Sequence, residues 1–333
     1  MVKKERNYKI DLIKVIGLFA IILAHVQPHE TVFQIRNFDV PLMVFVSGFL
    51  SYDSYNSSKS YLHHVFKRIK RLAIPTWLFL VFYFFVLLIL NRRFGVVFPY
   101  DKKQVIDSFL FLDGIGYIWI VRVYLLIELL LPLFIKILNK FDKKIIVLII
   151  GLLLIINEIF CVKGIYNLCW FNSYILSIVI SYGTISFMGL FSKKCSRQSY
   201  LWTSILFLII FSIYALYYYK VTGVFVYTQV KKYPPQMYYL SYALVITYLL
   251  FFINVKLKNN IIRKIIVFIS KSSFSIYLWH IFSIFLVTLF VPNIKWYFKY
   301  LIIILLSFII VIIRNYIVSK CKTLINKHDN IDK

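Results

Sequence analysis

The sequence contains few acidic residues and no long polar segment. Asp and Glu number 13 against 39 Lys and Arg, so the formal net charge is +26. Such an excess could indicate nucleic-acid binding. The basic residues, however, lie between apolar runs, where they determine the topology of membrane proteins. We therefore expect no nucleic-acid partner, and the shortage of polar sequence excludes a soluble domain of any size.

Cysteine is also scarce, and its spacing matches no metal site. Of the four cysteines, Cys161 and Cys169 are close enough in sequence to form a disulfide, which the sequence leaves open. His25 and His29 have the i, i+4 spacing of metal ligands, but no carboxylate motif accompanies them, so we predict no metal. The first apolar run lacks a small-residue cleavage site and is interpreted as a retained span.

Apolar residues, in contrast, make up 61% of the chain, and the mean hydropathy is +0.80. Repeated apolar runs of about 20 residues predict membrane-spanning helices. We expect an all-α polytopic membrane protein with about ten transmembrane helices, forming a single domain over residues 1–333 with no internal repeat. The expected spans are 9–28, 38–52, 73–90, 115–138, 145–161, 173–191, 201–218, 237–254, 265–290 and 298–318.

The distribution of basic residues between these spans predicts the orientation. By these boundaries, 22 Lys or Arg lie on the side of the two termini and 10 on the other side. Basic residues concentrate on the cytoplasmic side of a membrane. Both tails, residues 1–8 and 319–333, and the polar loop 53–72 are therefore expected in the cytoplasm. The longest loop on the other side is expected at 91–114.

The first span carries three ionisable side chains. Lys14 and His25 are 11 residues apart, so on a helix they point in nearly the same direction, about 16.5 Å apart along the axis. Asp11, three residues before Lys14, falls on the same face. Ionisable groups within a span usually face an interior site. The alternative is that Asp11 and Lys14 anchor the cytoplasmic end and His25 caps the other end near water.

A pair of arginines precedes the third span. Arg68 and Arg71 are neighbours on one helical face, and two guanidinium groups on one face suit a phosphate. The alternatives are an ordinary basic flank of a span or contact with anionic lipid headgroups.

The fourth span contains Trp119, Arg122, Tyr124 and Glu128. Six residues separate Arg122 from Glu128, which places them on opposite faces, so each is expected to meet another helix or water. The mid-span position of Glu128 favours a protein-lined cavity. In the ninth span, His280 follows Ser275 and Tyr277 and is expected to be bonded across helices.

Together these motifs resemble the acyltransferase-3 family of bacterial membrane acyltransferases. The family signature in the first span is a basic residue, ten residues, then histidine, here Lys14 and His25, with lysine where arginine is common. The resemblance covers about residues 8–315. The other matching segments are Val40-Pro41-Leu42, Ser47-Gly48-Phe49-Leu50, Arg68-x-x-Arg71 before Pro75, Trp119, Tyr233-Pro234-Pro235-Gln236 and Ser275 to His280.

The resemblance implies a multi-pass enzyme of the bacterial cytoplasmic membrane. It would move an acyl group, usually acetyl, from cytoplasmic acyl-coenzyme A to a hydroxyl of a surface polysaccharide or exported glycolipid. Its partners would be acyl-coenzyme A, a surface glycan or lipid-linked saccharide, and membrane lipids. Relatives with an additional soluble esterase-like domain differ from this chain.

The resemblance also suggests roles for the residues named above. Arg68 and Arg71 would hold the coenzyme phosphates, and His25 would act as general base toward the acceptor hydroxyl. A covalent acyl-histidine intermediate is an open alternative. Lys14, Asp11 and Glu128 complete the predicted catalytic set, and Trp119, Tyr124 and His280 are predicted to bind substrate or stabilise an oxyanion. Rival functions are a transporter or flippase of polysaccharide intermediates and a glycan polymerase.

Overall fold

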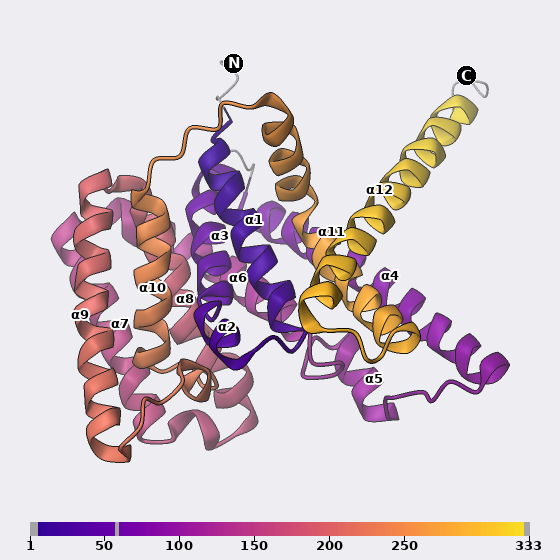
Figure 1. Cartoon of the computed structure of the whole chain (residues 1–333). Helices are drawn as coiled ribbons and strands as arrows, with labels where there is room; N and C mark the ends of the chain where they lie inside the picture. The colour runs from indigo at the N-terminus through magenta and orange to yellow at the C-terminus, as the bar shows by residue number, and fades with distance from the viewer. Residues whose placement is uncertain (1–5, 57–59, 330–333) are drawn as a thin grey trace.

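The computed structural model describes residues 6–56 and 60–329, and this part of the chain is helical without a strand. The all-α prediction is confirmed. Figure 1 shows the α-helices, with their labels, joined by short connections. Their bounds are α1 (Tyr8–Ala24), α2 (Glu30–Ile35), α3 (Asp39–Asn56), α4 (Tyr61–Phe94), α5 (Lys102–Phe109), α6 (Trp119–Lys140), α7 (Lys143–Val162), α8 (Ser177–Phe191), α9 (Arg197–Thr222), α10 (Met237–Phe252), α11 (Asn260–Phe290) and α12 (Trp296–Asp329).

Each of the ten predicted spans coincides with one long helix, and α2 and α5 are short helices in the connections. The predicted loop 53–72 is wrong over most of its length. Helix α3 continues to Asn56, and α4 begins at Tyr61, where the side chain of Ser60 accepts a hydrogen bond from the amide of His63. The part of the chain that the structure describes does not include residues 57–59 of this predicted loop, or residues 1–5 and 330–333 of the predicted tails.

In the described part of the chain, six helical stretches are long and apolar enough to cross a membrane. They are 61–94, 143–162, 172–194, 197–222, 260–290 and 296–320, and α10 is a shorter apolar helix. The remaining long helices, α1, α3 and α6, carry charged residues that the interior of the protein buries: Asp11, Asp39 and Glu128 are each less than 10% exposed. The chain is therefore a multi-pass membrane protein whose more polar helices lie inside the bundle.

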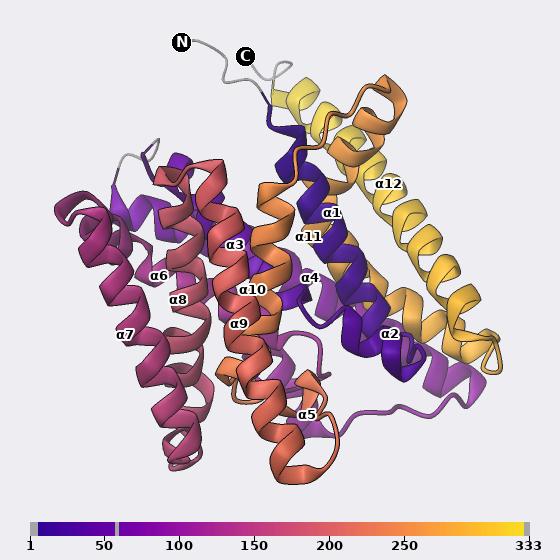
Figure 2. The same cartoon turned by 60° about the vertical axis from the view of Figure 1, so that its left-hand side comes forward.

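The helices pack as two groups around a shared centre. Helix α9 lies along α10, and α8 packs between α3, α6 and α7. On the other side α11 contacts α1, α4 and α12 (Figure 2). The beginning of α1 and the end of α12 lie at the same end of the bundle in both views. This agrees with termini on one side of the membrane.

Two glycines allow α3 and α8 to approach closely. A Cβ atom on Gly48 would lie 2.0 Å from the backbone oxygen of Ser186, and one on Gly189 would lie 2.1 Å from that of Phe45. Neither distance is compatible with a real side chain, so the crossing requires glycine on both helices.

Candidate active site

A cavity of about 320 Å³ opens among α1, α3, α4, α6 and α11. We call it the basic cavity, because Lys14, Arg68 and Arg71 line it. Arg68 and Arg71 share one face of α4, as their spacing predicted, and Tyr124 lies in the same wall. Arg71 is exposed to solvent, whereas Arg68 is partly covered. Two guanidinium groups and one amine at an open cavity form a site for an anion with several oxygens.

Glu128 faces this cavity but is bound by two basic side chains. Its Oε2 lies 3.0 Å from Nε2 of His64, and its Oε1 lies 3.4 Å from Nε of Arg68 and from the hydroxyl of Ser51. The expectation that Glu128 faces a protein-lined cavity is confirmed. These contacts indicate that Glu128 orients Arg68, and its predicted catalytic role stays a prediction. His64 was not singled out from the sequence.

The three ionisable groups of α1 do not form one continuous stripe. Asp11 accepts two hydrogen bonds from Arg6, at 2.6 and 2.8 Å, and a third at 2.6 Å from the hydroxyl of Ser270. It is not among the residues that line the basic cavity. Lys14 lines that cavity and donates to the backbone oxygen of Ser270 at 2.7 Å. The prediction that Asp11 faces the site is therefore corrected: its carboxylate ties the start of α1 to α11.

His25 lines a second cavity, of about 140 Å³, together with Trp119, Ile120 and Tyr277. We call this the histidine cavity. Helix α1 ends at Ala24, and His25 is its C-terminal cap, so the imidazole is partly exposed to the cavity. Its ring lies 4.6 Å from the ring of Tyr117, edge to face. The structure gives this imidazole no hydrogen bond to a described residue, and its nitrogens can therefore engage a ligand.

His280 lies beside His25, with the ring centroids 5.4 Å apart. Its Nδ1 bonds to the backbone oxygen of Tyr277 in the same helix, so the predicted bond across helices is wrong. In the neutral ring Nδ1 then carries the hydrogen, and Nε2 is an acceptor. This Nε2 is buried and has no partner among the described residues. In this tautomer His280 accepts a hydrogen bond and cannot donate one to an oxyanion.

A third cavity, of about 590 Å³, lies on the far side of the histidine cavity. We call it the aromatic cavity, because Trp119, Tyr174 and Tyr233 line it. Arg122 is held here: it donates to the backbone oxygen of Phe111 at 3.2 Å and lies over the ring of Tyr174 at 4.7 Å. Arg122 and Glu128 thus meet different partners, which confirms that they do not pair.

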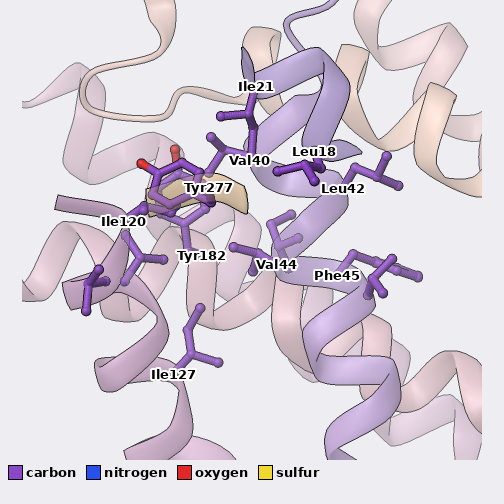
Figure 3. Packing of buried hydrophobic residues seen from close by; sticks show 14 of the residues in the cluster. Leu18, Ile21, Val40, Leu42, Val44, Phe45, Ile120, Ile127, Tyr182 and Tyr277 are labelled. Carbon is purple, nitrogen blue, oxygen red and sulfur yellow. The ribbon is translucent and has the colours of Figure 1, made fainter. Parts of the chain in front are cut away.

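The three cavities lie next to one another and share wall residues, and we call this row of cavities the route. Ile21, Ile120 and Tyr277 line both the basic and the histidine cavity. Figure 3 shows these three residues within the buried cluster. Trp119 and Tyr233, in turn, line both the histidine and the aromatic cavity. His25 therefore lies between a basic opening at one end and an aromatic cavity at the other.

A buried charge cluster completes the histidine cavity. Nη1 of Arg36 lies 2.8 Å from Asp39, and Nζ of Lys232 lies 3.5 Å from the same carboxylate. All three are less than 5% exposed. Burial lowers the pKa of Lys232 below its ordinary value, and the carboxylate of Asp39 opposes this effect. The sequence interpretation missed this cluster, because Arg36 and Lys232 read as loop charges and are 196 residues apart.

Comparison with known proteins identifies the family of this chain. No match is found among curated proteins or among solved structures. A family model described as an acyltransferase domain, that of the acyltransferase-3 family, matches residues 7–319 and so includes the whole route described above. Because this match covers nearly the entire chain, the protein belongs to the acyltransferase-3 family of membrane acyltransferases.

Proposed function

We propose that this protein takes an acyl group from cytoplasmic acyl-coenzyme A and transfers it to a hydroxyl of an exported saccharide or glycolipid. The observation that carries the proposal is the position of His25, between a basic cavity suited to phosphates and an aromatic cavity suited to a sugar. The donor reaches His25 from one side and the acceptor from the other. Acetyl is the acyl group we expect, and the bacterial cytoplasmic membrane is the expected location.

The basic cavity supplies the donor side of this proposal. Arg68 and Arg71 present fork-shaped donors to coenzyme phosphates, and Lys14 adds a third positive charge. Glu128 holds Arg68 from behind, which reduces the conformational freedom that binding must remove. The rise from Lys14 to His25 is about 16.5 Å along α1, a length suited to an extended pantetheine arm. Tyr124 and Tyr277 line the path between them.

His25 supplies the proton transfer. Its free imidazole nitrogen takes the proton of the acceptor hydroxyl while the hydroxyl oxygen forms a bond to the acyl carbon. The carbon–sulfur bond then breaks, and the coenzyme leaves as a thiol after receiving the proton. The products are an ester and free coenzyme, so no further reactant is required. His280, with its unpartnered Nε2, accepts a hydrogen bond beside His25 and helps to orient the acceptor.

A further polar group near His25 is the indole N–H of Trp119. Its indole is a donor only, and it lines the same cavity as His25. We assign Trp119 the role of donating to the oxyanion of the tetrahedral intermediate or to the sugar. It also lies edge to face with Tyr233, with centroids 5.7 Å apart, in the wall shared with the aromatic cavity. A sugar ring that leaves the aromatic cavity would meet this pair first.

The test is mass spectrometry of envelope glycans from cells with and without the gene. Loss of the mass of an acyl substituent, restored by the wild-type gene and not by a His25→Gln gene, is the expected result. A flippase would instead reduce the amount of exported glycan without changing its substituents. A polymerase would change its chain length. Unchanged glycan and lipid-linked saccharide masses would contradict the proposal.

A further inference from the structure

The wall of the histidine cavity carries more positive than negative charge. Arg36 and Lys232 contribute two cations, and Asp39 is the only acidic residue among those that line the cavity. Both oxygens of the Asp39 carboxylate already have partners. Oδ2 accepts a hydrogen bond from Arg36, and Oδ1 accepts one from the amide of Val40 at 2.8 Å and also faces Lys232. A buried excess of one positive charge is unfavourable unless a ligand compensates it.

Several polar atoms of this cavity still lack a partner. Arg36 is only 4% exposed, and its Nε is buried. This Nε has no hydrogen-bond partner among the described residues. The ammonium group of Lys232 has one ion pair, of 3.5 Å with Asp39, and lies 5.7 Å from the ring centroids of Tyr233 and Tyr239. It has three hydrogens to donate. The side-chain oxygen of Gln229, in the same wall, is also buried without a partner. These groups together offer donors for an anion and an acceptor for a hydroxyl.

We propose that Arg36 and Lys232 form a subsite for an acidic group of the acceptor, so that the enzyme selects an acceptor whose sugar carries a carboxylate or phosphate close to the acylated hydroxyl. This rests on the proposed function. In the proposed function the coenzyme phosphates bind in the basic cavity, so they are not the ligand of this subsite. The basic cavity lies on the other side of Ile21, Ile120 and Tyr277. The cluster faces the acceptor route, because Tyr233, the neighbour of Lys232, lines both the histidine and the aromatic cavity.

The test uses the purified full-length protein without donor, so that acyl transfer is not required. Diethyl pyrocarbonate modifies accessible histidines, and peptide mass spectrometry reports the rate at His25 separately from the other five. Glucose, glucuronate and glucose 6-phosphate are added as protecting probes. We expect an acidic sugar to protect His25 at a concentration about 10-fold or more below that of glucose, since hydrogen bonds to charged groups are the stronger ones. The two acids distinguish a carboxylate site from a phosphate site.

Variants make the assignment specific. Lys232→Gln leaves the Arg36–Asp39 pair intact, so the fold is retained, and it should remove most of the advantage of the acidic sugar. Lys231→Gln is the matched control, because this neighbouring lysine lies over Tyr218 and does not line the cavity. Equal protection by glucose and by both acids, or an unchanged preference in Lys232→Gln, would overturn the proposal. Charge-selective protection in a protein that transfers no acyl group would keep the subsite and reject the proposed reaction.

Discussion

His25 at the end of α1 and His280 in α11 hold their imidazole rings 5.4 Å apart, centroid to centroid, although 255 residues separate them in sequence. The ring of His280 is fixed by the backbone oxygen of Tyr277, while that of His25 makes ring contacts only. The two histidines therefore differ in freedom. We therefore propose His25, whose ring makes no hydrogen bond to a described residue, as the group that takes a proton from the substrate and releases it again.

Replacement of His25 by glutamine should reduce acyl transfer by about 10²–10⁴-fold, the usual contribution of general-base catalysis. Glutamine keeps a similar reach and hydrogen-bonding ability but cannot act as a base. The measurement is acceptor acylation by the purified protein, alongside coenzyme binding, which should stay unchanged. His29→Gln is the matched control, because His29 is exposed and only caps α2. Near-normal turnover in a well-folded His25→Gln protein would contradict the assignment.

Replacement of Arg71 by glutamine should weaken coenzyme A binding. A charge-assisted contact to a phosphate is worth about 1.5–3 kcal/mol, which corresponds to roughly 10- to 100-fold in the dissociation constant. Titration calorimetry in detergent measures this directly. Lys70→Gln removes the same charge from the adjacent exposed position, outside the lining of the cavity, and should have little effect. If both variants lose affinity equally, the arginines act only as a basic flank of the span.

Removal of the Glu128 side chain should destabilise the protein. Glu128→Ala leaves His64 buried without its carboxylate partner and frees Arg68, and loss of one partner of a buried ion pair costs about 3–5 kcal/mol. Thermal unfolding should occur several degrees lower. A double-mutant cycle with Arg68→Ala measures the coupling between the two side chains. If they are in contact, the losses of stability caused by the two single substitutions do not add up in the double variant. Additive effects would show that the carboxylate does not orient Arg68.

Alanine at Gly48 should disrupt the crossing of α3 and α8. The new Cβ would meet the backbone oxygen of Ser186, and overpacking of a close contact costs about 1–3 kcal/mol or more. Gly151→Ala is the control, since nothing lies within 4 Å of its Cβ position, and alanine in a helix is favoured over glycine by about 0.5–1 kcal/mol. Thermal unfolding of the two variants should therefore shift in opposite directions. A neutral Gly48→Ala protein would show that the helices separate readily.

The orientation can be measured by cysteine labelling in a cysteine-free background. Lys70→Cys, near the start of α4, should resist an impermeant reagent in intact cells and react after permeabilisation, because the basic asymmetry places it in the cytoplasm. Val97→Cys, in the exposed segment after α4, should react in intact cells. The reverse pattern would place the basic cavity outside and remove its access to cytoplasmic coenzyme.

The sequence by itself determined the features that depend on helical periodicity and on hydropathy. Ten apolar runs specify ten long helices, because a span must satisfy its backbone hydrogen bonds internally. The 11-residue spacing directs Lys14 and His25 to one side of α1, and both line the route. The i, i+3 spacing likewise puts Arg68 and Arg71 in one cavity.

Tertiary structure decided which of these polar groups meet one another. Asp11 shares the face of Lys14 by periodicity, yet Arg6 and Ser270 capture it, since a buried carboxylate takes the nearest donors. Glu128 meets His64 across 64 residues, and Lys232 meets Asp39 across 193. Such pairs depend on how helices distant in sequence pack together, and hydrophobic periodicity carries no information about which charged residue lies opposite another.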